Sequence, residues 1–185
     1  KINNKLITPG IVSYLEPGCG FGGSCFPKDV KALSFLASKL NLNNYILKSI
    51  IKTNEEQINK IVEIVLKNVK QKKTNILILG LAFKPKTDDI RESPSIKLIK
   101  KLLKNKKIIV EVFDPVAENN TRKIFKDSIK YSTSLSQSTK NKDIIIVMTK
   151  WQIFKGLNNL LPKNSNSLII DPRRFLKKNR FKNYS

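Results

Sequence analysis

The chain has 185 residues, of which 40% are hydrophobic, and a formal net charge of +22. This length buries one good core or two modest ones, and no apolar run approaches the roughly 20 residues that span a bilayer. The chain lacks histidine, which excludes histidine ligands and a histidine general base, so we expect no metal site. Residues 1–8 lack the apolar stretch of a signal peptide, and we expect a cytoplasmic protein whose two cysteines are free thiols.

The first informative segment, Pro17–Asp29, reads Pro-Gly-Cys-Gly-Phe-Gly-Gly-Ser-Cys-Phe-Pro-Lys-Asp. The helical spacing of the apolar residues that follow, with Pro27 at the first helical position, predicts a helix from about Pro27 to Leu40. Cys25 would then lie just outside the helix N-terminus, where unpaired N–H groups, the helix dipole and Lys28 favour the nucleophilic thiolate. From these residues alone, a plain glycine-rich turn with an inert cysteine remains the alternative.

A second helix is predicted from about Asn44 to Val69, because the apolar residues recur at the spacing of a long amphipathic helix. This helix is longer than one small domain requires. We therefore expect it to pack against a second copy of the chain, giving a homodimer, or against a domain outside the chain. The polar, Lys-rich stretch Lys70–Asn75 marks a boundary between a helical unit, residues 1–72, and a second unit, residues 73–185.

The second unit alternates strands and helices. Its opening run, Asn75–Ala82, is continuously apolar, as in strands buried on both faces, and Ser93 and Pro94 supply the cap and first residue of the next helix. The further expected elements are a strand at Ile108–Phe113, a helix at about Val116–Phe125, a strand at Ile144–Met148, a short helix around Trp151–Leu157 and a strand at Leu168–Ile170. This alternation predicts an α/β fold with a parallel sheet, which binds ligands at the carboxyl ends of its strands.

Two segments fall at that edge of the predicted sheet. The loop Phe83–Pro94 follows the first strand and concentrates cations and carboxylates within twelve residues, which indicates either a binding loop or a solvated connection. The triplet Asp171-Pro172-Arg173 follows the last strand. The Arg173 guanidinium can bind phosphate or carboxylate oxygens as a planar fork, or it is one half of a solvated Arg-Arg pair.

The charge of +22 also requires a nucleic-acid hypothesis. Its distribution argues against one, because lysines are spread over every predicted element without aromatic interleaving or zinc-finger spacing. We expect neither a nucleic-acid nor a membrane partner, and interpret the charge as a solvated surface that also attracts nucleotide phosphates. A basic nucleic-acid-binding protein remains the alternative of another class, and it predicts tight, steeply salt-dependent binding to DNA or RNA.

Three motifs carry a family resemblance. Gly20–Asp29 reads Gly-Phe-Gly-Gly-Ser-Cys-Phe-Pro-Lys-Asp, Gly80–Ser95 contains Gly-Leu-Ala-Phe-Lys-Pro-Lys-Thr-Asp-Asp-Ile-Arg-Glu-Ser-Pro, and Ile169–Arg173 is a strand end followed by Asp-Pro-Arg. All three resemble signatures of the nucleotide-sugar 6-dehydrogenases, the family of the UDP-glucose and GDP-mannose dehydrogenases. The third departs from the family's Asp-Gly-Arg at Pro172, which leaves the shape of that turn to be tested.

The resemblance implies a fold and a reaction. Residues 1–72 match a central helical dimerisation region with the catalytic cysteine loop, and residues 73–185 match a Rossmann-like nucleotide-sugar-binding domain. The family's N-terminal NAD-binding domain has no counterpart before Lys1, so the chain is expected to be a C-terminal portion that is inactive alone. The implied reaction oxidises the sugar C6 alcohol to a carboxylate by four electrons through a Cys25 thiohemiacetal and thioester, with NAD as the cofactor.

The resemblance also implies roles for individual residues. Cys25 matches the nucleophile, and Asp29 matches a carboxylate that helps to activate the hydrolytic water. Lys28 and Arg91 match contacts to NAD. The residues that match substrate contacts are Tyr14, Leu15, Glu16, Pro17, Gly18, Gly22, Phe83, Lys84 and Arg173.

The sugar is less closely defined by these motifs. UDP-glucose is the first expectation, but Pro9-Gly10-Ile11 stands where UDP-glucose enzymes often carry Arg-Ile-Gly. The approach Tyr14-Leu15-Glu16-Pro17-Gly18 resembles that of the GDP-mannose branch. GDP-mannose and UDP-N-acetylhexosamines therefore stay open as alternative substrates.

Overall fold

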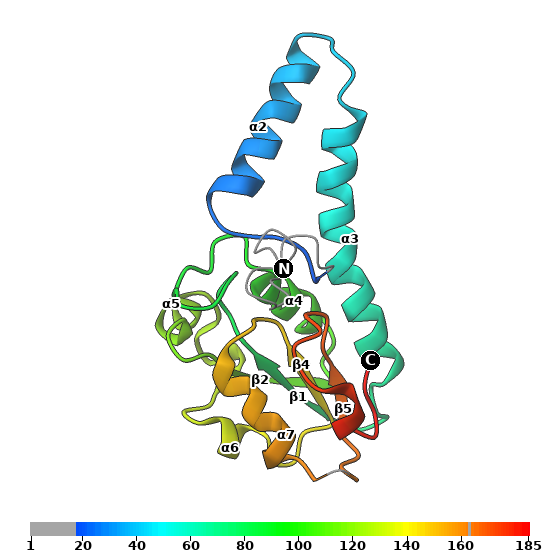
Figure 1. Ribbon diagram of the computed structural model, residues 1–185, viewed down its shortest axis with the longest axis vertical. Coiled ribbons are helices and arrows are strands. Elements are labelled where there is room, and N and C mark those ends of the chain that lie inside the picture. Colours follow the sequence, from blue (N-terminus) through cyan, green and yellow to red (C-terminus); the bar gives the residue numbers. More distant parts are fainter. Residues whose placement is uncertain (1–17, 163) are drawn as a thin grey trace, which may run out of the picture.

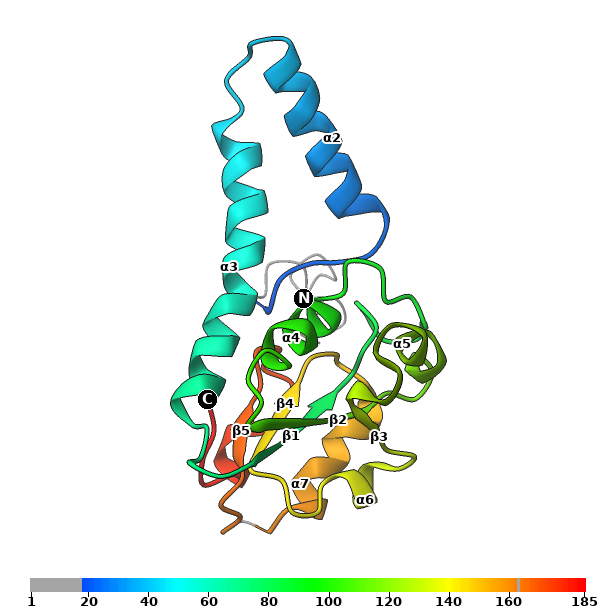
Figure 2. The same ribbon diagram turned by 180° about the vertical axis from the view of Figure 1, so that it is seen from behind.

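A helical hairpin projects from a parallel sheet in the computed structural model, which describes residues 18–162 and 164–185 (Figure 1). The hairpin consists of α2, Cys25–Lys39, and α3, Tyr45–Lys67. The Asn44 side chain fixes the connection between them, because its Nδ2 donates to the Ser34 carbonyl at 2.7 Å and lies 2.9 Å from the Ser38 hydroxyl. The second half of α3 continues alongside the sheet, whereas α2 stands clear of it (Figures 1 and 2).

The start of α2 corrects the prediction. The helix begins at Cys25 rather than at Pro27, so Cys25 is its first residue instead of lying just outside it, and Ser24 takes the N-cap position. Pro27 is tolerated inside the first turn because the N–H that proline lacks would have no intrahelical acceptor there. The thiol is therefore carried by the helix itself. The long helix α3 lies within two residues of its predicted ends.

Within the described residues, five strands form one sheet in the order β3-β2-β1-β4-β5, and every pairing is parallel (Figure 2). The predicted α/β fold with a parallel sheet is thus confirmed. The strands are β1, Thr74–Leu79; β2, Ile108–Phe113; β3, Lys130–Tyr131; β4, Ile144–Val147; and β5, Leu168–Ile170. The central strand β1 is buried on both faces, as its continuous apolar run predicted.

Successive residues of β1 point into two different cores, as the alternation of a strand requires. Ile76 and Ile78 belong to a core shared with α3 and with α4, Pro94–Leu102, while Leu77 and Leu79 belong to a core on the opposite face. The 3-10 helix η2, Gln152–Gly156, and α7, Leu157–Leu160, contribute to the second core. The remaining helices are α5, Glu118–Phe125; η1, Lys126–Ser128; α6, Leu135–Ser138; and η3, Lys178–Arg180.

Several element boundaries differ from the sequence prediction. The helix expected from Val116 begins at Glu118, because the Asp114 carboxylate accepts the N–H groups of Val116 and Ala117 and holds them in a turn. The single helix expected around residues 151–157 is a 3-10 helix followed by α7. The strand β3 and the helix α6 were not predicted, since two and four residues are too short to show a periodic pattern.

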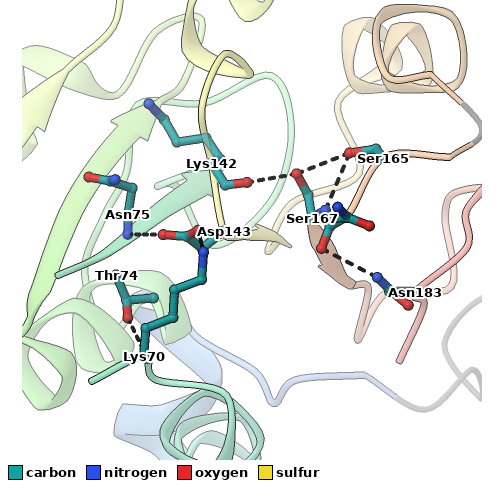
Figure 3. A network of polar contacts seen from close by, with 9 residues as sticks. Lys70, Thr74, Asn75, Lys142, Asp143, Ser165, Ser167 and Asn183 are labelled. Carbon is teal, nitrogen blue, oxygen red and sulfur yellow. Dashed lines mark hydrogen bonds and ion pairs between the residues drawn. The ribbon is translucent and has the colours of Figure 1, made fainter. Parts of the chain in front are cut away.

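The connection between α3 and β1 is tied to the amino-terminal edge of the sheet (Figure 3). Asp143, which precedes β4, accepts the Asn75 N–H at 2.8 Å and the Lys70 ammonium, and the Thr74 hydroxyl accepts the Lys70 N–H. Burial raises the pKa of Asp143, but the hydrogen bonds from Lys70 and Asn75 outweigh it and hold this pKa below its usual value. The predicted boundary between the two units, at residues 72/73, falls in this connection. Because α3 shares a core with the sheet, the division of the chain into two units stays a prediction.

No helix among residues 18–162 and 164–185 is both long enough and apolar enough to cross a membrane.

Candidate active site

Cys25 lies at an open position on the first turn of α2. Its side chain is exposed, and the Sγ atom lies 3.7 Å from the hydroxyl of Ser24. The next residue, Phe26, is 55% exposed and packs edge to face on Phe21, with 4.6 Å between the ring centroids. The thiol is therefore accessible to a substrate.

The loop that leads to the thiol is fixed to α3 by one side chain. Asn54 exchanges two hydrogen bonds with the backbone of Phe21: its Oδ1 accepts the N–H at 2.7 Å and its Nδ2 donates to the carbonyl at 3.2 Å. A Cβ atom at Gly20 would lie 2.5 Å from the Asn54 Oδ1, and Gly20 has a φ of +98°. Only glycine combines that backbone conformation with such close approach.

The same loop contacts the segment after β1 from the other side. The Gly23 N–H donates to the Arg91 carbonyl at 2.9 Å, and a Cβ atom at Gly22 would lie 2.5 Å from the Glu92 carbonyl oxygen. Gly23 also lies against the ring of Phe83: a Cβ atom on Gly23 would be 3.0 Å from the nearest carbon of that ring. The fold thus brings together two segments of the sequence, residues 18–25 and 83–92, as their predicted roles require.

Arg173 links the loop to the carboxyl end of β4. Its Nε donates to the Met148 carbonyl at 2.9 Å, and its Nη2 donates to the Gly20 carbonyl at 3.5 Å. Its Nη1 lies beside Gly18, where a Cβ atom would be only 3.0 Å from that nitrogen. Cys19 belongs to the same loop and is buried, with its Sγ 3.9 Å from the Met148 carbonyl oxygen. Burial raises the pKa of the Cys19 thiol against the opposing charge of Arg173. Cys19 is therefore the inert cysteine of the pair.

The turn at Pro172 is well ordered by the residue before it. The Asp171 carboxylate is 3% exposed and accepts the N–H groups of Phe175 and Leu176, both at 2.7 Å, and the Tyr184 hydroxyl at 2.9 Å. It also accepts the Arg173 N–H at 3.2 Å. Proline in place of glycine consequently leaves Arg173 held at the ligand-binding edge of the sheet.

Two predicted cofactor contacts lie on the exposed side of the site. Lys28 forms an ion pair with Asp29 at 3.4 Å, and both side chains are largely exposed, so they are a neighbouring pair on the first turn of α2. Arg91 is held by both oxygens of Asp89, at 3.0 and 2.7 Å. Its hydrogen bonds to Asp89 and the charge of that carboxylate raise the pKa of Arg91. The Arg91 backbone reaches the thiol loop through the Gly23 N–H, two residues before Cys25.

Side chains hold most of the first backbone groups of the segment after β1. The hydroxyls of Ser95, Ser93 and Thr149 donate to the carbonyls of residues 80, 81 and 82, at 2.8, 2.6 and 2.8 Å. The Asp114 carboxylate accepts the N–H groups of residues 81 and 82 and the indole N–H of Trp151. This framework fixes where Phe83 and Lys84 leave the sheet, with the Lys84 ammonium 5.4 Å above the Phe83 ring.

Sequence reasoning did not single out several of these supporting residues. Asn54 could have been noticed as an amide among the apolar residues of a long helix, and Asp114 as a carboxylate directly after a buried strand. Thr149 and Glu92 gave no separate signal. Four predicted substrate contacts, Tyr14, Leu15, Glu16 and Pro17, lie outside the described residues. Gly18, Gly22, Phe83, Lys84 and Arg173 all lie around the loop before Cys25 or at the carboxyl edge.

A parallel sheet with a cysteine loop over its carboxyl edge is the arrangement of a nucleotide-sugar dehydrogenase. Residues 77–178 match the UDP-binding domain of the UDP-glucose/GDP-mannose dehydrogenase family, and residues 4–56 match its central domain. The first match alone covers more than half of the chain, so this chain belongs to the UDP-glucose/GDP-mannose dehydrogenase family.

Individual relatives give the same result. UDP-glucose 6-dehydrogenases of Rickettsia conorii and Rickettsia prowazekii are 39% and 40% identical, each over 89% of this chain and 39% of their own length. The structure of a UDP-glucose dehydrogenase from Pyrobaculum islandicum superimposes with a TM-score of 0.79 at 32% identity, covering 91% of this chain and 38% of that protein. A GDP-mannose dehydrogenase from Pseudomonas aeruginosa has a TM-score of 0.74 at 27% identity, over 93% of this chain and 39% of that one. The chain thus spans about two fifths of the length of these relatives.

Proposed function

We propose that this chain is the C-terminal part of an NAD-dependent nucleotide-sugar 6-dehydrogenase that converts UDP-glucose to UDP-glucuronate. The observation that carries the proposal is the exposed Cys25 thiol on the first turn of α2, whose loop contacts Phe83 and the Arg91 backbone through Gly23. UDP-glucose is favoured because curated relatives with that activity are 39–40% identical to the chain. GDP-mannose and UDP-N-acetylhexosamines remain the alternative substrates.

The proposed reaction removes four electrons from the sugar in two oxidations. After the first, the C6 aldehyde accepts the Cys25 sulfur, and the carbonyl oxygen takes a proton to give a thiohemiacetal. Oxidation of this adduct gives a thioester, which holds the substrate so that no aldehyde is released. Water then attacks the thioester carbonyl, and the C–S bond breaks to give the carboxylate and the free thiol. Asp29, exposed and one turn along the helix from Cys25, is proposed to orient that water.

NAD accepts the electrons of both oxidations when it is bound. The residues of this chain fit two contacts to it, because Lys28, on the first turn of α2, and Arg91, in the segment that contacts the thiol loop, are exposed cations. Arg91 is already oriented by Asp89, so its guanidinium is presented to a ligand without losing further side-chain freedom. The proposed role of the two cations is to bind the anionic and hydroxyl groups of the dinucleotide.

The nucleotide sugar is proposed to lie across the carboxyl edge of the sheet. Phe83 offers a ring and Lys84 an exposed ammonium for the base and phosphates, and Arg173 offers the part of its guanidinium that Met148 does not occupy. Gly18 and Gly22 are proposed to line the sugar, and neither position has room for a side chain, because a Cβ atom would meet Arg173 or Glu92. These contacts would place C6 beside Cys25.

The hairpin is proposed to pair with a second copy of the chain in the cytoplasm. Large apolar side chains lie exposed along α2, α3 and their connection, including Phe35 at 72%, Tyr45 at 74% and Ile46 at 77%. Exposed apolar surface of this extent is typical of a protein interface. Analytical ultracentrifugation of the full-length protein tests this, and a monomer at micromolar concentration would contradict it.

The function is tested by NADH production from the full-length protein with UDP-glucose. We expect Cys25→Ser to abolish acid formation, while Cys19→Ser retains it because that thiol is buried away from the substrate. The isolated chain should bind a nucleotide sugar in calorimetry without oxidising it, and a panel of UDP and GDP sugars identifies the preferred substrate. Normal turnover by Cys25→Ser would refute the assignment.

A further inference from the structure

The thiol loop and the segment after β1 fit together at four residues, Gly22, Gly23, Arg91 and Glu92, which we call the interlock. One strong hydrogen bond, from the Gly23 N–H to the Arg91 carbonyl, crosses it at 2.9 Å. The Glu92 carbonyl occupies the space beside Gly22, where a Cβ atom would be only 2.5 Å from the oxygen and 3.0 Å from the carbon. Any side chain at Gly22 would therefore push the two segments apart.

Glu92 adds a charged contact on each side of the interlock. Its Oε2 lies 2.6 Å from the Lys97 ammonium on α4 and 3.6 Å from the Lys31 ammonium on α2. The hydrogen bond from Lys97 lowers the pKa of Glu92 against the effect of burial, so the carboxylate is ionised at neutral pH. Glu92 thus bridges a helix buried on the sheet, α4, and the helix that begins with the thiol.

The backbone of Glu92 has an unusual conformation, which indicates that the surrounding structure fixes the position of this residue. Its φ is +51°, in the left-handed region that residues other than glycine, asparagine and aspartate seldom occupy. Such conformations persist where the surrounding structure fixes them, and they gather at functional sites. Here the unusual backbone turns the carbonyl toward Gly22 while the side chain reaches Lys31 and Lys97.

We propose that Glu92 is a positioning residue. Through its ion pair with Lys31 and through the interlock, it fixes the position of the Cys25 thiol relative to the loop that carries Phe83 and Lys84. This inference rests on the function proposed above. Because the ion pair joins Lys31 on α2 to Glu92, which α4 also holds through Lys97, the bridge limits rotation of the first turn about the loop of residues 18–24. Glu92 itself does not contact the reacting atoms.

The kinetic test uses the full-length protein and matched pairs of variants. We expect Glu92→Gln to lower kcat for acid formation by about threefold to fivefold, the range that a half-exposed ion pair supplies, with KM changed less than twofold. Gly22→Ala should lower kcat about 100-fold, as an ångström-scale displacement of a catalytic group does. The controls are Glu55→Gln, an exposed glutamate on α3, and Gly156→Ala, whose Cβ would make an ordinary 3.6 Å contact with Leu135.

Coupling distinguishes positioning from a general loss of structure. If Glu92 acts through Lys31, Glu92→Gln should have little further effect on kcat in a Lys31→Met background, whereas independent structural defects would multiply. Hydrogen exchange gives a readout that does not need activity: the Gly23 amide should exchange slowly in the wild type and at least tenfold faster in Gly22→Ala. Unchanged kcat in Glu92→Gln, or full multiplication with Lys31→Met, would overturn the proposal.

The two hypotheses fail in different ways. If the wild-type protein oxidises no nucleotide sugar, the proposed function fails, and positioning is then judged by the rate at which iodoacetamide alkylates Cys25. A twofold or greater change of that rate in Glu92→Gln, absent in Glu55→Gln, supports the positioning role. An unchanged rate would overturn it. If the wild type is active but Glu92→Gln and Gly22→Ala have the same kcat as their control variants, the proposed function stands and the role of the interlock fails.

Discussion

Asn54 gives the sharpest test of how α3 holds the thiol loop. Replacing it with alanine removes both hydrogen bonds to Phe21, the 2.7 Å bond from the N–H and the 3.2 Å bond to the carbonyl. Each such bond contributes a net stability of about 1 kcal/mol, so we expect the free energy of unfolding to fall by about 2 kcal/mol. Alanine also favours helix more than asparagine does, and this partly offsets the loss.

The control for that offset is Asn59→Ala, because Asn59 is an exposed asparagine on the same helix, with no hydrogen bond from its side chain among the described residues. Urea unfolding of the two variants, followed by circular dichroism, isolates the contribution of the Phe21 contacts. With a slope of about 2 kcal/mol per molar urea, the midpoint of Asn54→Ala should lie about 1 M below that of Asn59→Ala. Equal midpoints would show that the Asn54 side chain does not fix the loop.

Three further changes test the framework of the sheet. Gly80→Ala should destabilise the fold by several kcal/mol, about 3 or more, and lower Tm, because its φ is +91° and a Cβ would lie 2.4 Å from that of Thr149. Ser93→Ala should cost about 2 to 3 kcal/mol in urea unfolding, since the buried hydroxyl both accepts the Ser95 N–H that caps α4 and donates to the Leu81 carbonyl. Because the pKa of Asp143 is lower in the folded than in the unfolded protein, its contribution to the free energy of unfolding is fully present above the unfolded pKa of about 4. This contribution is lost as pH falls through the folded pKa. Asp143→Asn should therefore flatten the acid limb of the stability curve, and an unchanged limb would contradict this.

The regular part of the fold followed from pattern alone. The apolar run Asn75–Ala82 and the Ser93-Pro94 cap predicted a buried parallel strand and the helix after it; the helix begins at Pro94 as predicted, whereas the strand ends at Leu79, three residues before Ala82. The strands β2 and β5 lie at their predicted bounds. These elements could be predicted because periodicity and caps are local properties of the chain.

The remaining features depend on contacts between distant residues. The start of α5 was misplaced by two residues because the Asp114 side chain captures two N–H groups that would otherwise open the helix. Glycine richness predicted a loop that approaches a ligand closely, but it could not reveal that Gly20 faces Asn54 and Gly22 faces Glu92. Such partners are set by tertiary packing, which no local pattern records.

Two buried carboxylates explain how the site is shaped before any ligand binds. Asp114 after β2 and Asp171 after β5 are each 3% exposed, and each accepts several backbone N–H groups of the turn that follows it. Each also accepts a hydrogen bond from an aromatic residue, Trp151 or Tyr184, and burial together with the Asp171 contact raises the pKa of Tyr184, so its hydroxyl stays a donor. Because these turns carry their own hydrogen bonds, the loops with Phe83 and Arg173 would need little ordering to bind the proposed nucleotide sugar, which leaves more of the contact energy for affinity.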